Sequence, residues 1–491
     1  MRRGMRFALA AGVLVSLCSV QARVQSHNGR AALPNEWWNS AAAIVRVSLN
    51  PVEPERSFPI DPKRAGPILE RYKREGISAI EIFAPYHGGH SFRGLDIINP
   101  FEIDPRIGTM EDFRSLVRLI HGKGMAVTVF VNLGYASAEA PEFLKAERDE
   151  EAGKTTAETR RFLWSNRVDA TPPEDGNNSY FLIGDRKKSF WAYSARAGKY
   201  FWTTWEGPNL SGKVVRLPQY NWRSDEFQQR AVKIVRFWMD QGIDGMVVDA
   251  ANWYLGYTWQ IGRKRITDVA RSYGNAYLQP EGAGGFGDDP VAWITEGGWN
   301  SVQDYGLGIW WKKNTDVLNQ AIETGDPRPI ERKLRDYHDR VVAAGGTLYY
   351  GPDQRPHSED PAKTRLYLAT EALVGDLVAV SARQAMELDP EIAKLFRMKA
   401  AHPALYQASA RRPLPTNDDD KYYAFLRTAA HDSERVLVVM NFQPEPEKIV
   451  VDLSGVLSRR LVDLLDGGVL EPRTRMSISV PAYGYRLFRV D

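Results

Sequence analysis

The chain has 491 residues, of which 43% are hydrophobic and 11% aromatic, as expected of a globular protein of two or three domains. A net charge of +3 over this length argues against a nucleic-acid binder, because no basic stripe is present to release phosphate counterions. The 14 Trp and 21 Tyr are numerous, and aromatic faces are surfaces on which sugar rings stack.

The first 22 residues have the pattern of a secretory signal peptide. Three arginines precede an apolar run from Phe7 to Val20, and Val20-Gln21-Ala22 is a small-residue cleavage site. The run is too short to span a bilayer. We therefore predict a signal peptide over residues 1–22 and a secreted or periplasmic mature chain with no membrane attachment. The only cysteine, Cys18, lies in this segment, so the mature chain has no thiol chemistry.

Apolar runs then alternate with helical patterns. Strands are predicted at residues 41–49, 77–83 and 127–133, with a helix at 62–76 and another that Thr109 caps. This alternation is typical of a parallel α/β sheet.

Residues 138–221 interrupt the alternation. They are charged, aromatic and rich in turn residues, and about 80 residues are too many for a simple loop. We predict a small inserted domain over this range.

The alternation resumes with a helix that Ser224 opens. Further strands are predicted at residues 243–249, 276–281, 300–305, 346–353 and 377–381, and a long polar helix at about 328–344. The eight strands predict a (β/α)8 TIM barrel built from residues 23–137 and 222–407. From residue 408 the apolar period changes to 2, which predicts a C-terminal antiparallel β-sandwich over 408–491.

Three carboxylates end predicted strands four, five and seven: Asp249, Glu281 and Asp353. A buried apolar strand does not end in an ionised carboxylate unless that group is paired, hydrogen-bonded or catalytic. The ordinary alternative is a set of helix caps and loop acids. In a barrel these strand ends share one mouth, and two carboxylates about 5–5.5 Å apart are the apparatus of a retaining glycosidase. One attacks the sugar, and the other holds a proton because its environment raises its pKa.

Several segments then carry a family resemblance. Residues 94–113 are similar to a G-Y-D-…-I-D-P-x-x-G-T-x-x-D-F segment, residues 242–249 to G-I-D-G-F-R-x-D, and residues 277–281 to a strand that ends in an acid/base glutamate. Shorter similarities cover residues 217–221, 397–405 and 435–442. These motifs resemble the α-amylase superfamily, glycoside hydrolase family 13.

The resemblance implies the fold, with a barrel, an insert after strand three and a C-terminal β domain. It also implies a retaining α-glycosidase acting on α-glucosides or oligosaccharides, with Asp249 as nucleophile, Glu281 as acid/base and Asp353 as stabiliser. A transglycosylase would use the same residues, and a non-catalytic carbohydrate-binding relative is the alternative from another class. The expected partner is a carbohydrate substrate, and the expected state is a monomer or small homo-oligomer.

The departures from the family pattern concern the predicted sugar subsite. The third-strand motif D-V-V-x-N-H becomes Phe130-Val-Asn-Leu-Gly-Tyr135, and the arginine two residues before the nucleophile becomes Val247. In the family that aspartate and arginine lie together, and removing only one would leave an unpaired buried charge. We therefore expect an apolar wall beside Asp249. Leu95 also replaces the tyrosine of G-Y-D, and Gly351-Pro352 precede Asp353.

Some assignments have alternatives. Glu296 could replace Glu281 as the acid, and Glu359 or Asp360 could replace Asp353. The expected substrate-binding residues are Tyr135, Trp253, His87, His90 and His357. The histidines form no metal-site pattern, so we predict no metal and no cofactor. Gly134 replaces the asparagine that usually binds calcium in the family, which leaves calcium as an open alternative.

Overall fold

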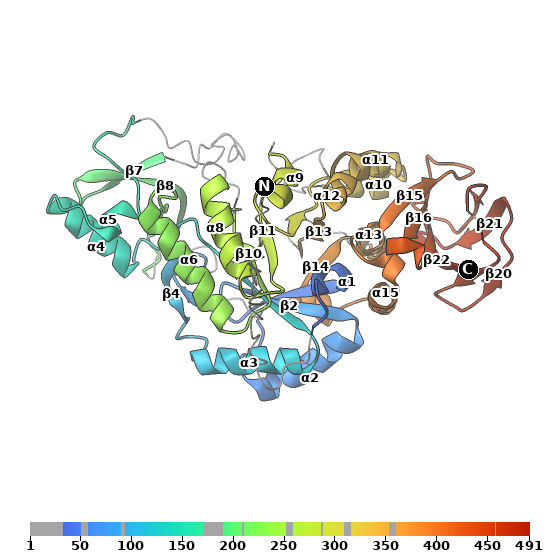
Figure 1. Cartoon of the computed structure of the whole chain (residues 1–491), viewed down its shortest axis with the longest axis horizontal. Helices are drawn as coiled ribbons and strands as arrows, with labels where there is room; N and C mark the ends of the chain where they lie inside the picture. Colours follow the sequence, from blue (N-terminus) through green and yellow to red (C-terminus); the bar gives the residue numbers. More distant parts are fainter. Residues whose placement is uncertain are drawn as a thin grey trace, which may run out of the picture.

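The computed structural model describes residues 33–50, 57–89, 94–170, 190–208, 211–251, 259–285, 288–308, 316–352, 360–456 and 458–491. At its centre lies an eight-stranded parallel sheet in the order β11-β10-β5-β2-β1-β14-β13-β12 (Figure 1). Its two outer strands meet, since the Asn300 amide donates to the Leu278 carbonyl at 3.3 Å. The predicted (β/α)8 barrel is confirmed. Its strands are β1 (Ala43–Ser48), β2 (Ile77–Phe83), β5 (Ala126–Val131), β10 (Gly245–Val248), β11 (Tyr277–Pro280), β12 (Ser301–Gln303), β13 (Thr347–Tyr350) and β14 (Leu377–Ser381).

The barrel strands are buried because helices cover them. All residues of β1, β5 and β10 are buried, as expected for parallel strands covered on both faces. The segment at Trp37 and Trp38, just before the first strand, forms the short helix α1. The helices of this part of the chain are α1 (Trp37–Ser40), α2 (Pro62–Arg74), α3 (Met110–Gly122), α6 (Asp225–Asp240), α8 (Trp259–Arg271), α9 (Pro290–Thr295), α10 (Val317–Thr324), α13 (Pro361–Val374), α14 (Ala382–Met386) and α15 (Pro390–Ala401).

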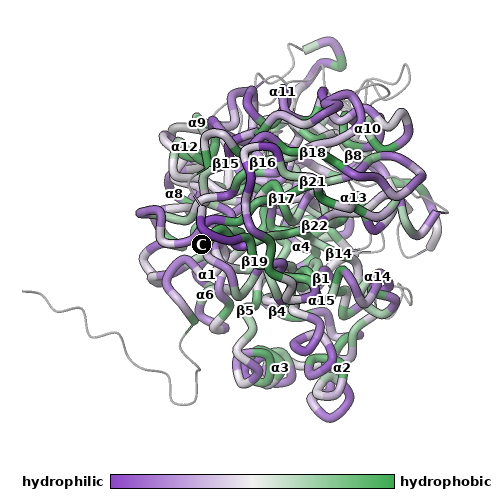
Figure 2. The backbone as a smooth tube through the Cα atoms, turned by 90° about the vertical axis from the view of Figure 1, so that its right-hand side faces the viewer, coloured by the Kyte–Doolittle hydropathy of each residue, from purple (hydrophilic) through white to green (hydrophobic). Residues whose placement is uncertain are grey.

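Helix α3 shows how local sequence sets an element. Thr109 accepts a hydrogen bond from the Asp112 amide, and Asp112 accepts one from the Thr109 amide, which completes a capping box. Phe113, Leu116 and Ile120 form the buried face. In Figure 2 this helix carries hydrophobic colour on one side and hydrophilic colour on the other, as an amphipathic helix should.

The insertion follows β5 and precedes α6. Its antiparallel sheet has the order β6-β8-β7, with β9 paired to β8. The boundaries at 138 and 221 stay a prediction. A separate hairpin of β3 (Tyr86–Gly88) and β4 (Ile97–Ile103) follows β2. The elements of the insertion are α4 (Pro141–Glu151), α5 (Ala157–Arg160), β6 (Trp164–Ser165), β7 (Phe190–Ser194), β8 (Lys199–Pro208) and β9 (Val214–Pro218).

The C-terminal part is antiparallel, as predicted, and lies at one end of the molecule beyond α13 and α15 (Figure 1). Its larger sheet has the order β15-β16-β17-β22-β19-β20, and β18 pairs with β21. A second apolar core, which includes Leu437, Ile449 and Phe488, fills the space between the two sheets. Its strands are β15 (Ala410–Leu414), β16 (Tyr422–Thr428), β17 (Arg435–Asn441), β18 (Glu447–Asp452), β19 (Leu461–Asp463), β20 (Val469–Leu470), β21 (Arg475–Val480) and β22 (Gly484–Val490), with 3-10 turns at Pro403–Leu405 and Ala430–Asp432.

The long polar helix predicted at about 328–344 is not a uniform α-helix. It consists of α11 (Arg328–Lys333), the π-helical segment η3 (Leu334–His338) and α12 (Asp339–Ala343). A Cβ atom added at Gly306 would lie 2.7 Å from the Tyr337 Cβ, so the π segment presses closely on the loop after β12. Segments of this type inside α-helices are frequent at functional sites.

Within the described residues, no helix combines the length and the apolar character needed to cross a membrane. The predicted signal peptide, residues 1–22, lies outside the described residues.

We expect Thr109→Ala to lower the free energy of unfolding by about 1 kcal/mol, because α3 loses its cap. Ser224→Ala is the matched control, since Ser224 precedes α6 without a side-chain cap hydrogen bond. It should change stability by less than about 0.5 kcal/mol. Urea unfolding followed by tryptophan fluorescence measures both. Equal losses in the two variants would contradict the role given to the capping box.

Candidate active site

The neighbouring strands β10 and β11 end side by side in two acids. Val248 is in register with Pro280, so the next residues, Asp249 and Glu281, leave the barrel together. The Asp249 amide donates to the Val131 carbonyl at 2.8 Å, and the Glu281 amide donates to the Val248 carbonyl at 2.9 Å. Both acids are therefore fixed by the barrel ladder itself.

The two carboxyl groups hydrogen-bond each other. Asp249 is only 7% exposed, whereas Glu281 is half-buried. Burial raises the pKa of Asp249 well above its ordinary value, and the adjacent Glu281 raises it further, while Arg46 and Tyr135 act in the opposite direction. Two carboxyl groups in contact do not both ionise readily, so the raised pKa of Asp249 favours its protonated form.

The backbone after Asp249 is strained, and this conformation directs an amide group to Glu281. Ala250 has a φ of 43°, in the left-handed region that residues with a Cβ rarely adopt. In this conformation its amide donates to Oε2 of Glu281 at 3.0 Å. Strain of this kind persists only where surrounding structure enforces it, and it is concentrated at functional sites.

Tyr135 reaches the pair from the turn after β5, and its predicted contact with sugar stays a prediction. Its hydroxyl group donates a hydrogen bond to Asp249, and the side chain is 3% exposed. Asn132 holds this turn, because its Oδ1 accepts from the Gly134 amide at 2.6 Å and its Nδ2 donates to the Tyr135 carbonyl at 2.8 Å. The Gly134 carbonyl accepts a hydrogen bond from the Tyr220 amide at 2.8 Å, so both backbone polar groups of Gly134 form hydrogen bonds that hold the turn in place.

The apolar pair predicted beside Asp249 is present, but a buried charge that was not predicted lies against it. Phe130 and Val247 are buried neighbours in register, as the sequence suggests. However, the Arg46 guanidinium lies 4.7 Å from the centre of the Phe130 ring, an arrangement that favours the cation. Because this charge lowers the pKa of Asp249, strand β1 supplies a positive charge that we did not expect.

Arg46 is held inside the barrel by a closed network. Its Nε pairs with Glu81 Oε1, its Nη2 donates to the Tyr349 hydroxyl at 2.9 Å, and that hydroxyl donates to Glu81 Oε2 at 3.2 Å. Glu81 is fully buried, and burial raises its pKa even though Arg46 and Tyr349 lower it. Because neither Arg46 nor Glu81 reaches solvent, the positive charge of Arg46 is balanced by the Glu81 carboxylate inside the barrel.

A signal for this network was present in the sequence. Arg46 interrupts one predicted apolar strand and Glu81 interrupts the next, and the two are paired in register. Opposite charges at matching positions of adjacent buried strands favour an ion pair.

The remaining predicted residues divide into three groups. His87 lies on β3, half-exposed, with its Nδ1 2.8 Å from Oε1 of Glu102 on β4, and its contact with sugar stays a prediction. Glu296 is exposed at the end of α9, and Asp360 caps α13 by accepting from the Ala362 amide at 2.8 Å, so neither lies with the carboxyl pair. The residues outside the described part of the chain are Asp353, Trp253, His90, His357 and Glu359.

Two family models match the chain. The model described as alpha amylase, catalytic domain, matches residues 71–281, and the model described as maltogenic amylase, C-terminal domain, matches residues 413–487. The first match spans β10 and β11 and contains both Asp249 and Glu281.

Individual proteins are similar over shorter stretches. The chain is 27% identical over 181 residues to a probable oligo-1,6-glucosidase 2 of Bacillus subtilis, a match that covers 37% of this chain and 29% of that protein. It is 31% identical over 160 residues to a trehalose synthase of Thermus thermophilus, a match that covers 32% of this chain and 14% of that protein. In both cases the chain spans less than a third of the relative's length. The crystal structure of an alpha-amylase from H.orenii superposes with a TM-score of 0.68 at 18% identity, covering 91% of this chain and 99% of that one, which shows the shared fold.

We expect Arg46→Met to lower the free energy of unfolding by about 3–5 kcal/mol at neutral pH, because Glu81 keeps a buried charge without its partner. The pKa of Glu81, already raised by burial, should rise further. A carboxyl group with a raised folded pKa binds more protons in the folded state. The variant should therefore regain stability as the pH falls from that value towards the unfolded pKa of about 4.3.

The control is Glu81→Gln in the Arg46→Met background. It should recover at least half of the lost stability and remove the pH dependence, since the buried charge is gone. Thermal unfolding between pH 4.5 and 8 measures both effects. A pH-independent loss that Glu81→Gln does not relieve would contradict the ion-pair account.

Proposed function

Because the chain belongs to the α-amylase superfamily, glycoside hydrolase family 13, we propose that it cleaves α-glucosidic bonds as a retaining glycosidase. The observation that carries the proposal is the placement of Asp249 and Glu281 side by side at the ends of neighbouring barrel strands. A retaining glycosidase holds its two carboxyl groups about 5–5.5 Å apart, so the proposal requires this hydrogen-bonded pair to separate when a sugar enters between them. A retaining glycosidase needs a nucleophilic carboxylate and a carboxylic acid on either side of one glycosidic bond.

In the first step Glu281 is the acid and Asp249 the nucleophile. The Ala250 amide binds Glu281 Oε2, which leaves Oε1 to carry the proton towards the glycosidic oxygen. Burial and Glu281 raise the pKa of Asp249, and the Tyr135 hydroxyl and the Arg46 charge act against this rise and favour the ionised form that the nucleophile needs. As the proton moves to the leaving oxygen, Asp249 attacks the anomeric carbon and forms a covalent glycosyl-enzyme.

In the second step Glu281, now ionised, takes a proton from water, and the water oxygen displaces Asp249 from the sugar. Two inversions at the anomeric carbon give net retention. A developing positive charge on the sugar ring would be stabilised by the Asp249 carboxylate. The rings of Phe130 and Phe83 are stacked with their centres 4.9 Å apart, and the Arg46 guanidinium lies 4.7 Å from the centre of the Phe130 ring.

Transfer of glucose to a sugar hydroxyl group is the second candidate. The 31% identity to a protein named trehalose synthase favours it. The residues and first step are the same. A high concentration of acceptor sugar distinguishes the two, because transfer yields longer or rearranged glucosides in place of free glucose.

Asp249→Asn and Glu281→Gln should have different kinetic signatures. We expect Asp249→Asn to abolish turnover of maltose, isomaltose, trehalose and 4-nitrophenyl α-glucoside, because no glycosyl-enzyme forms. Glu281→Gln should lower kcat/KM on the disaccharides by about 100-fold to 10,000-fold, since their leaving group needs a proton. Its first step on the nitrophenyl glucoside should be much less affected, because that leaving group needs none.

Glu296→Gln and Asp360→Asn are the matched controls, because each changes a carboxylate outside the pair. Both should retain full activity. Turnover that survives Asp249→Asn, or is lost in Glu296→Gln, would contradict the assignment. A folded wild-type chain that binds these sugars without turnover would favour the non-catalytic alternative.

Tyr135→Phe should move the acidic limb of the kcat/KM profile to higher pH. The Tyr135 hydroxyl group lowers the pKa of Asp249, so its removal raises that pKa, and a higher pH is then needed to ionise the nucleophile. Tyr273→Phe is the control, since its hydroxyl group bonds Asp240 outside the site at 2.6 Å. A profile that falls in height but keeps its acidic limb would give Tyr135 a purely structural role.

A further inference from the structure

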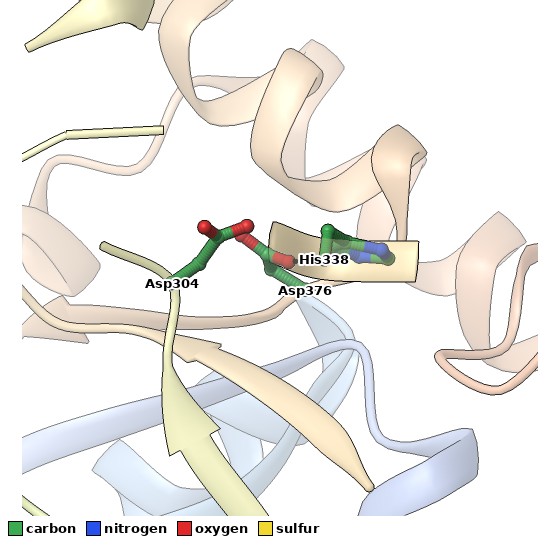
Figure 3. A group of neighbouring side chains, drawn as sticks. All are labelled: Asp304, His338 and Asp376. Atoms are coloured by element: carbon green, nitrogen blue, oxygen red, sulfur yellow. Dashed lines mark ion pairs between the residues drawn. The ribbon is translucent and has the colours of Figure 1, made fainter. Parts of the chain in front are cut away.

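A second group of buried ionisable side chains lies away from the Asp249–Glu281 pair. Asp304 follows β12, Asp376 precedes β14, and His338 ends the π segment η3. Figure 3 shows the two carboxyl groups directed towards each other, with the His338 ring beside Asp376. None of these residues takes part in the proposed glycosidic reaction.

The geometry of this group matches a metal site. One ligand atom from each residue lies within 4.8 Å of the other two, and His338 Nε2 lies 3.3 Å from Asp376 Oδ1. Two ligands bound tetrahedrally to Zn²⁺ at about 2.1 Å are about 3.4 Å apart. The observed separation is thus close to that of two ligands on one ion.

Burial makes a bound cation favourable. Asp304 and Asp376 are 0% exposed and His338 is 1% exposed. Within the described residues, no hydrogen bond reaches either carboxylate oxygen of Asp376 or either ring nitrogen of His338. Buried charges of this kind are paired or bind metals.

The neighbouring cations are engaged elsewhere. Lys399 Nζ donates to the backbone carbonyl of Asp376, and Arg427 Nη1 donates to the Val374 carbonyl at 2.5 Å. Both therefore bind main-chain oxygens, and the Asp376 carboxylate is left facing His338 and Asp304 (Figure 3).

A further contact orients His338 as a metal ligand. Its Nδ1 lies 3.5 Å from Asp339 Oδ1, and Asp339 in turn binds Arg411 at 2.7 Å. Metal-bound histidines commonly direct their other ring nitrogen to a carboxylate, which fixes the ring and leaves Nε2 for the ion.

We propose that Asp304, His338 and Asp376 bind one zinc-type divalent metal ion, which joins β12, β14 and the α11–α12 helical segment. One imidazole and two carboxylates suit Zn²⁺ or Co²⁺, whereas Ca²⁺ prefers six to eight oxygen ligands. The ion has a structural role, because all three ligands are buried and none contacts the carboxyl pair at the barrel mouth.

The test is metal analysis of the untagged full chain after incubation with Zn²⁺ and gel filtration. We expect one equivalent of zinc in the wild type and less than a tenth of an equivalent in His338→Gln. Chelation should lower the Tm of the wild type by a few degrees and leave that of His338→Gln unchanged. Co²⁺ in place of zinc should give a visible absorption band in the wild type that His338→Gln lacks.

The matched control is His121→Gln. His121 also forms a buried pair, but its Nε2 lies 2.7 Å from Asp244 Oδ2, which additionally accepts from the Val127 amide at 2.8 Å. This variant should keep its zinc. If His338→Gln fails to fold, Asp304→Asn replaces it and should also lose the metal. A wild type that retains neither Zn²⁺ nor Co²⁺, or variants that retain a full equivalent, would overturn the proposal.

Discussion

Direct contact between two neighbouring carboxyl groups is the constraint on which the candidate site depends. The barrel ladder fixes Asp249 and Glu281 next to each other, and burial together with Glu281 raises the pKa of Asp249. Tyr135 and Arg46 favour charge on Asp249, while the strained Ala250 amide holds Glu281 by one oxygen. Tyr135 and Arg46 thus oppose the rise in the pKa of Asp249 that burial and Glu281 cause, and the proposed role of Asp249 as nucleophile depends on this opposition.

The positive charge near Asp249 comes from a different barrel strand than the family resemblance implies. The family resemblance places an arginine on the fourth strand, where this chain has Val247. Here Arg46 on β1 supplies the charge and lies over Phe130. The strands of a barrel converge on one mouth, so a side chain from another strand can reach the same region. The consequence is a second buried acid, Glu81, whose charge Arg46 must also balance.

The sequence predicts the barrel strands well because their apolar runs and the helical patterns between them are local signals. Asp249 and Glu281 are predictable for the same reason, since each directly follows such a run. The Arg46 network is not local: its partners are 35 and 303 residues away in the chain, so register and barrel closure bring them together. The π segment that ends at His338 also escapes prediction, because polar helical periodicity does not reveal where tertiary contacts widen a turn.

The most direct measurement of the central claim is to identify the residue that carries the sugar in the glycosyl-enzyme. A fluorinated glucosyl fluoride that reacts normally in the first step but slowly in the second should trap this species. Peptide mass spectrometry should then place the label on Asp249, and Glu281→Gln should still become labelled. A label on another carboxylate, or no label on a chain that releases glucose from maltose, would contradict the account.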